Sequence, residues 1–247
     1  MNRSPRTARP PRPAEPEARA GRRWLLVAAV AGVLFTALAV LLATRAWAPF
    51  PFERAAVDWA ADHRPAAARS VAVALTRLGS AVVPYLLALA AGAVNLRATP
   101  APRSARRAAV QLAAPVLWLI AGQFLRLGVM HACGRPRPPQ TEWATEASGF
   151  SFPSGHSFTA AVSSGLLALA VARAHPAAAG AAVAWAAVFT AAVGLSRIYL
   201  GVHWPLDVLG GWLLAAGWLA LGAVVLRPLQ PTAPPRDTHE PAGPPPA

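Results

Sequence analysis

Six long apolar runs constrain this chain more than any other feature of its sequence. Each run is close to the roughly 20 residues that an α-helix needs to cross the hydrocarbon layer of a membrane. The runs are 24–44, 75–95, 108–131, 155–172, 177–196 and 207–226. A backbone inside lipid must satisfy its own hydrogen bonds, which helices do within one segment. We therefore predict an all-α integral membrane protein with six transmembrane helices in a bundle.

The composition supports this class. Of the 247 residues, 55% are hydrophobic and 13% are charged, about half the charged share of a soluble domain. The formal net charge of +13 would suit nucleic acid, but no basic face with interleaved aromatic residues occurs in the sequence. The basic residues instead flank the apolar runs. We expect the lipid bilayer as a partner and no nucleic acid.

The distribution of Arg predicts the topology. Fourteen Arg lie in the N-terminal tail, in 97–107, at Arg173 and in the C-terminal tail, against seven on the opposite side. Segments rich in positive charge stay in the cytoplasm. We therefore predict a multi-pass protein of the cell (inner) membrane with both termini cytoplasmic.

The chain divides into three parts. Residues 1–23 are rich in Pro and Arg and lack apolar periodicity, which predicts a disordered cytoplasmic tail. Residues 227–247 are Pro-rich and predict a second disordered cytoplasmic tail, so the membrane domain is 24–226. Within it, 49–69 is too polar to span, and it forms either a short interfacial helix on the outer side or a plain connector.

Three polar segments interrupt the apolar pattern on the predicted extracytoplasmic side. They are GRPRPP (134–139), FPSGHSF (152–158) and SRIYLGVHWPLD (196–207). Charged groups at membrane depth are costly and mark functional sites. We expect the three segments to form one active site at the extracytoplasmic ends of the third to sixth predicted helices.

The first two segments carry groups suited to an oxyanion. Ser154 is a favoured N-cap residue, and Gly155 leaves the first free amides of the following helix open to an anion. His156 would lie in the first turn, beside that anion. The guanidinium forks of Arg137 and Arg197 match the paired oxygens of a phosphate.

The third segment carries a candidate nucleophile. His203 and Asp207 stand four residues apart, and Pro205 fits the first turn of a helix. The Asp207 carboxylate can then reach back to His203. A carboxylate on one imidazole nitrogen selects the tautomer and makes the other nitrogen a better nucleophile.

These segments resemble the three motifs of the type 2 phosphatidic acid phosphatase family, which shares its site architecture with vanadium-dependent haloperoxidases. The family motifs are Lys-x6-Arg-Pro, Pro-Ser-Gly-His and Ser-Arg-x5-His-x3-Asp. The second and third are intact at 153–156 and 196–207, and the resemblance covers 24–226. The first motif ends in Arg137 and Pro138 but has Met130 at the Lys position. The chain contains no Lys, so the candidates for the missing cation are Arg126, His131 and Arg135.

The resemblance implies a phosphatase of lipid phosphates that needs no metal and no cofactor. His203 would attack phosphorus to form a phosphohistidine, with its imidazole oriented by Asp207. His156 would protonate the leaving oxygen and then activate water. The implied substrates are phosphatidic acid, phosphatidylglycerol phosphate and a polyprenyl diphosphate such as undecaprenyl diphosphate. The phosphate oxygens would be held by Arg137, Ser154, Gly155 and Arg197.

Two other interpretations stay open. His203, Asp207 and His156 could ligate zinc in a metal hydrolase, although two Arg and a helix N-terminus disfavour a cation there. A non-catalytic lipid-phosphate binder or transporter is the second, and Met130 in the first motif favours it. No pattern in the sequence indicates the oligomeric state.

Overall fold

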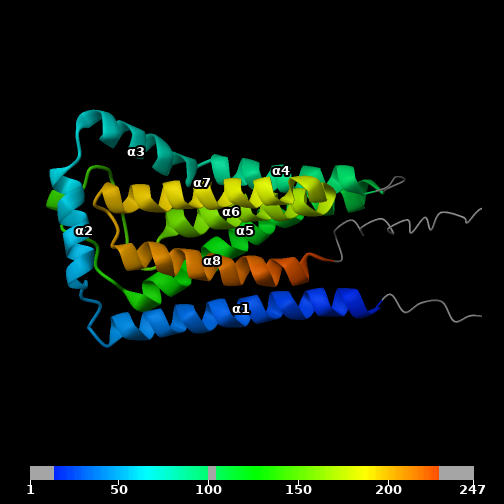
Figure 1. Cartoon of the computed structure of the whole chain (residues 1–247), viewed down its shortest axis with the longest axis horizontal. Helices are drawn as coiled ribbons and strands as arrows, with labels where there is room; N and C mark the ends of the chain where they lie inside the picture. The colour runs from blue at the N-terminus through cyan, green and yellow to red at the C-terminus, as the bar shows by residue number, and fades with distance from the viewer. Residues whose placement is uncertain (1–13, 100–103, 228–247) are drawn as a thin grey trace, which may run out of the picture.

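The chain folds into a bundle of helices, seen in the computed structural model of Figure 1. The structure describes residues 14–99 and 104–227, and no β-strand occurs among them. The long helices are α1 (Ala14–Ala43), α5 (Ala105–Cys133), α6 (Gly155–Ala174), α7 (Ala179–Tyr199) and α8 (Pro205–Val225). The shorter helices are α2 (Pro51–Asp62), α3 (Ala66–Leu78) and α4 (Val83–Ala98), with 3₁₀ turns η1 (Gln140–Glu142) and η2 (Pro176–Ala178).

The helix lengths confirm the all-α, multi-pass membrane class. In the described part of the chain, 5 helices are long and apolar enough to cross a membrane, and α3 with α4 makes a sixth candidate that is bent by 46°. The bend lies at 79–82, so the prediction of one helix over 75–95 is wrong. Gly79 ends α3, and Pro84, which has no backbone N–H, fits the first turn of α4.

Two further boundaries concern the first third of the chain. Helix α1 begins at Ala14, so residues 14–23 belong to the first helix rather than to a tail. Ala, Glu and Arg favour helix there and extend it outward. Residues 1–13 and 228–247 of the predicted tails lie outside the described residues. Within 49–69 the chain forms α2, which lies across one end of the bundle, as an interfacial helix would (Figure 1).

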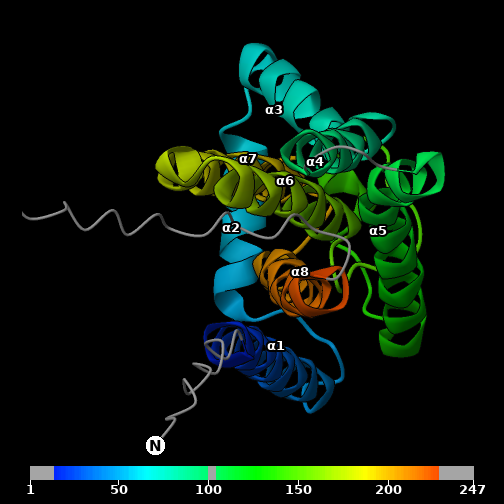
Figure 2. The ribbon, with the colours of Figure 1, turned by 90° about the vertical axis from the view of Figure 1, so that its right-hand side faces the viewer.

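Helix α6 lies at the centre of the bundle, in contact with α4, α5, α7 and α8 (Figure 2). Phe158 and Val162 on α6 pack in one cluster with Leu119 of α5 and Ala215 of α8. Helix α1 lies beside α8. Large apolar side chains also point outward, such as Phe124 with 70% of its surface exposed. An outward apolar face suits lipid, where helix association depends on close packing rather than on the hydrophobic effect.

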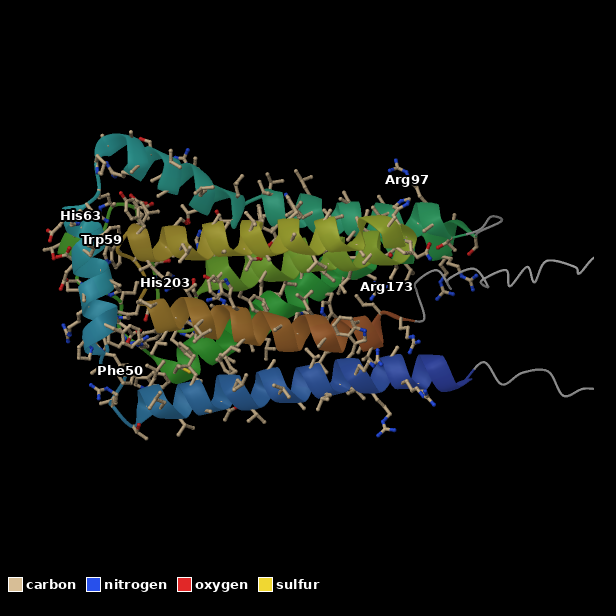
Figure 3. All side chains as sticks on the ribbon, in the orientation of Figure 1. Phe50, Trp59, His63, Arg97, Arg173 and His203 are labelled. Carbon is tan, nitrogen blue, oxygen red and sulfur yellow. The ribbon has the colours of Figure 1, made fainter. Side chains whose placement is uncertain are left out.

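The two ends of the bundle carry different groups. Figure 3 shows Arg97 and Arg173 near the end where α1 begins and α8 stops, with His203, Phe50 and Trp59 towards the opposite end. This arrangement agrees with the predicted grouping of the Arg-rich segments beside the termini. It also brings the three polar segments together at the end covered by α2.

Helix α8 packs closely against the start of α6, and Gly211 allows this approach. A Cβ atom on Gly211 would lie 2.8 Å from the Ser154 carbonyl oxygen and 3.0 Å from Ser157 Cβ. Because Gly211 has no side chain, the Pro-Ser-Gly-His segment can pack directly against the first turns of α8.

We expect Gly211→Ala to lower the free energy of unfolding by about 1–3 kcal/mol, the usual cost of overpacking. Thermal unfolding in detergent measures the change. Gly128→Ala on α5 is the matched control, because no heavy atom outside its chain neighbours and the nearby backbone of α5 lies within 4 Å of its added Cβ. Ala favours helix, so the control is expected to be neutral or slightly stabilising. Equal stability of the two variants would contradict the close packing.

Candidate active site

A cavity of about 450 Å³ opens at the end of the bundle covered by α2. Its walls come from α5, the loop 134–154, α6, α7 and the turn before α8. Five of the predicted site residues line it: Arg137, Gly155, His156, Arg197 and His203. Segments far apart in the sequence therefore meet at one place, as the three motifs predict. Two predicted residues, Ser154 and Asp207, are fully buried behind this wall.

His203 lies in the turn between α7 and α8, with 2% of its surface exposed. Its Nε2 is 3.1 Å from Nη1 of Arg137, and its Nδ1 is 3.4 Å from Oδ2 of Asp207. A guanidinium group only donates hydrogen bonds, so Nε2 is the acceptor and the ring proton is assigned to Nδ1. This tautomer directs the Nε2 lone pair towards the cavity side.

Burial lowers the pKa of the His203 imidazole well below its usual range, and the positive charges of Arg137 and Arg197 lower it further. Burial and nearby cations both disfavour the protonated, positively charged form of an imidazole. His203 is therefore neutral at pH 7, the form in which a histidine can act as a nucleophile.

Asp207 lies in the first turn of α8. Its Oδ2 accepts a hydrogen bond from the Trp204 amide at 2.8 Å, and its Oδ1 accepts one from Nη1 of Arg135 at 2.7 Å. The carboxylate also faces His203 Nδ1, as the spacing of the two residues predicts. The distance of 3.4 Å is long for a hydrogen bond, so the contact is chiefly electrostatic in this structure.

The guanidinium group of Arg137 is held by the backbone of two segments. It donates to the carbonyls of Ser148 and Gly149 in the loop after α5 and to the carbonyl of Val202 beside His203. These bonds fix its place at the cavity and leave it in contact with Nε2 of His203. Arg137 thus joins the first and third motifs.

Arg197 and Arg126 place buried, unpaired donors beside the cavity. Arg197 is 3% exposed and donates through Nη1 to Thr76 Oγ1 on α3 at 2.8 Å. Its Nε, like the Nε of Arg126, is buried and has no hydrogen-bond partner among the described residues. Buried polar groups without partners are rare and costly. Because Arg126, Arg137 and Arg197 all line the cavity, their guanidinium groups give it a positive charge that suits an anion.

The position of the missing Lys is occupied by Met130, which is buried. Its sulfur accepts a hydrogen bond from Nη1 of Arg126, one helical turn away, at 3.1 Å. The Arg126 guanidinium reaches the start of α6, where a Cβ on Gly155 would lie 3.3 Å from its central carbon. Arg126 and His131 both line the cavity.

Arg135, the third candidate for the missing cation, does not line the cavity. It is fully buried and forms ion pairs with Glu53 at 2.7 Å and with Asp207 at 2.7 Å. Of the three open candidates, Arg135 therefore lies away from the place where a phosphate would bind in this structure. Its side chain turns away from the cavity because two buried carboxylates bind it.

Ser154 is the N-cap residue of α6, but it makes no side-chain capping bond. Its hydroxyl instead accepts a hydrogen bond from Ser157 at 3.0 Å, and its amide donates to the backbone carbonyl of Asp207 at 2.9 Å. In this structure Ser154 joins α6 to α8 rather than facing the cavity.

Two residues of this region were not identified from the sequence. Thr76 holds Arg197, and Glu53 holds Arg135. An acidic residue two positions after Pro51 is a common sign of a helix N-terminus, which gives Glu53 an ordinary explanation. The described residues also contain no group of three or more His, Cys, Asp or Glu side chains placed to hold a metal ion.

The family model described as the PAP2 superfamily matches residues 111–230, which carry all three motif segments. The chain belongs to the type 2 phosphatidic acid phosphatase (PAP2) superfamily. The family resemblance seen in the motifs is thereby confirmed.

Two individual proteins are similar to this chain. The crystal structure of a transmembrane PAP2-type phosphatidylglycerolphosphate phosphatase from Bacillus subtilis matches with a TM-score of 0.64 and 27% identity, over 80% of this chain and 93% of that chain. An undecaprenyl-diphosphatase from Sulfolobus acidocaldarius is 49% identical over 39 residues, 16% of this chain and 18% of that relative. The first similarity extends beyond the motif-bearing helices, and the second spans less than a fifth of the relative's own length.

We expect the cavity to bind orthovanadate, an oxyanion with the shape of phosphate, and to depend on Arg126 for it. Losing one charge-assisted hydrogen bond of about 1.5–3 kcal/mol should weaken binding about 10- to 100-fold in Arg126→Met. The vanadate-induced rise in melting temperature, titrated to give Kd, measures this.

The exchange Arg126→Met with Met130→Lys is expected to recover most of the affinity, because it returns one cation to the same helical face. Arg54→Gln on α2, an exposed residue at the same end, is the control and should bind like the wild type. Undiminished vanadate binding in Arg126→Met would contradict the role of Arg126.

Proposed function

We propose that the protein is a membrane-embedded phosphatase that hydrolyses a lipid phosphomonoester or diphosphate through a phosphohistidine on His203. The observation that carries the proposal is the buried His203 between a carboxylate and a guanidinium group, beside a cavity lined by three Arg side chains. Membership of the PAP2 superfamily and the similarity to two phosphatases support it.

In the first step, Nε2 of His203 attacks phosphorus and the bond to the leaving oxygen breaks. His156, at the start of α6, gives that oxygen a proton. Arg137 must first release Nε2, and the incoming phosphate provides new acceptors for its guanidinium group. The imidazole then carries a positive charge opposite Asp207. A covalent intermediate divides one difficult displacement into two easier ones.

In the second step, His156 takes a proton from water, and the water oxygen attacks the phosphohistidine. The P–N bond breaks, phosphate leaves, and His203 returns to its neutral form. Arg126, Arg137 and Arg197 compensate the charge spread over the phosphate oxygens, which is the main requirement of phosphoryl transfer. The free amides at the start of α6, with Gly155 among them, add the positive end of a helix dipole.

Within this proposal Arg126 takes the place of the family's Lys. It lines the cavity, lies against Gly155 and has an unpaired Nε. Arg135 is engaged elsewhere, and His131 lies on an exposed part of α5. Ser154 would contribute to phosphate binding only through its place in the turn that starts α6.

The substrate class follows from where the cavity lies. Leu127 belongs to its wall and is also 38% exposed on the outer face of α5, so a lipid tail can lie along the bundle while its phosphate enters the cavity. The candidates are phosphatidic acid, phosphatidylglycerol phosphate and a polyprenyl diphosphate such as undecaprenyl diphosphate. With the Arg-rich end of the bundle cytoplasmic, the cavity would open on the extracytoplasmic side.

The decisive experiment measures phosphate release from these three lipids by purified protein, with His203→Ala beside it. We expect turnover in the wild type, none in His203→Ala, and retained vanadate binding in the variant because the Arg residues remain. Turnover should survive exhaustive EDTA and be inhibited by vanadate. Wild-type turnover that persists in His203→Ala would exclude the phosphohistidine. Lipid binding without turnover in the wild type would favour the non-catalytic binder.

The lowered pKa of His203 predicts the acid side of the pH profile. The neutral ring is the reactive form, and a depressed pKa keeps it neutral as the pH falls below the ordinary histidine value of about 6.5. The acid limb of kcat/KM should therefore lie clearly below pH 6.5, after the titration of the substrate phosphate near pH 6 has been measured by ³¹P NMR and divided out. An intrinsic limb at pH 6.5 or above would contradict a buried neutral His203.

A further inference from the structure

A buried ion-pair cluster lies behind His203, on the side away from the cavity. It consists of Glu53 on α2, Arg135 in the loop after α5 and Asp207 on α8, and all three side chains are fully buried. Arg135 donates to both oxygens of Glu53, at 2.7 and 3.2 Å, and to Asp207 at 2.7 Å. The same Arg135 nitrogen, Nη1, therefore contacts both carboxylates.

The cluster is held from several directions. Besides Arg135, Glu53 accepts the amide of Phe50 at 2.9 Å and the amide of Leu206 at 3.1 Å. Nε of Arg135 donates to the Trp47 carbonyl at 3.3 Å. Glu53 thus has four hydrogen-bond donors, and the group that it orients is Arg135. The bonds from Glu53 and Trp47 fix the orientation of the Arg135 guanidinium group. Arg135 in turn binds the Asp207 carboxylate, which faces His203.

The charges of the cluster suit the reaction at His203. Two carboxylates and one guanidinium group leave a net charge of −1. A positive charge forms on the imidazole when Nε2 bonds to phosphorus, and the cluster then becomes neutral overall. Arg135 alone would cancel the charge of Asp207, and Glu53 restores it. Without Arg135, two like charges would lie close together and one carboxylate would favour a proton.

On the basis of the function proposed above, we propose that Glu53 and Arg135 are positioning residues for His203, which set the orientation and the net charge of the Asp207 carboxylate. The simpler alternative is that they only fasten α2 to α8. The two roles differ in what they change: a fastening affects the amount and stability of folded protein, whereas a positioning role affects kcat and its pH dependence in the folded protein.

Other charged groups around His203 stay constant in the test. Those on the cavity side come from α5, the loop 134–154, α6 and α7, whereas α1 packs against this end with the apolar residues Leu38 and Leu42. Besides His203 itself, the titratable and charged groups on the cavity side are Arg126, His131, Arg137, Glu146, His156 and Arg197. Because neither Glu53 nor Arg135 is one of them, substitutions in the cluster should change kcat with KM altered by less than about threefold.

The experiment compares full-length wild type, Glu53→Gln, Arg135→Gln and the double variant, with His203→Ala as the inactive reference. The net charges of the cluster are −1, 0, −2 and −1 in that order. Each single variant should lose about 10- to 100-fold in kcat, the size of effect known for residues that orient metal-binding histidines. In Arg135→Gln the acid limb should also move to higher pH, because a carboxylate takes up a proton.

The double variant decides between the two roles. If the charge of the cluster matters, it should be more active than either single variant, and its acid limb should return towards the wild-type pH. If the pair only fastens α2, the double variant should be at least as impaired as the worse single variant, which would overturn the inference. Arg64→Gln is the control, since Arg64 also binds backbone carbonyls, of Tyr199 and Glu142, without touching the cluster. It should keep the wild-type pH profile.

A variant that does not fold and a wild type without turnover are distinguished from a failure of the inference as follows. If a Gln variant does not fold, Arg135→Lys keeps the net charge of −1 and should retain the wild-type acid limb; a shifted limb overturns the inference. Wild-type turnover with equal kcat in all the cluster variants overturns this inference alone. A wild type that releases no phosphate overturns the proposed function together with it.

Discussion

The carboxylate of Asp207 is the group on which the rest of the site depends. It is fully buried, and a buried charge without partners costs several kcal/mol. Arg135 and the Trp204 amide bind it, and His203 faces it. The backbone carbonyl of the same residue accepts the amide of Ser154 and so holds the start of α6. Asp207 on α8 thus faces the imidazole and also binds the start of α6 and the loop after α5.

The sequence predicted which residues gather at the cavity because the motifs carry chemistry and helix position together. Arg137, His156, Arg197 and His203 all stand where an apolar run begins or ends, and alternate runs end on the same side. The bend between α3 and α4 was missed because hydropathy over a window reports length and not direction. Glu53 was missed because no pattern along the chain shows that α2 folds back over the start of α8.

Ser154 and Met130 show where local rules fall short. The capping rule predicts a bond from the Ser154 hydroxyl to a free backbone amide of α6, but the hydroxyl accepts a bond from the Ser157 side chain instead. The motif spacing shows that a Lys is missing at Met130, yet it ranks Arg126, His131 and Arg135 equally. Only burial separates them, because the guanidinium of Arg135 is enclosed by carboxylates while that of Arg126 remains next to Gly155.

The hydrogen bond from Arg137 to Nε2 of His203 has a consequence for selectivity in a crowded bilayer. In the proposed mechanism, this bond occupies the lone pair of Nε2, so His203 would be unreactive towards an ester that does not displace Arg137. A headgroup with two negative charges draws the guanidinium away more strongly than a neutral one does. In the proposed mechanism, discrimination by headgroup charge would therefore precede bond making.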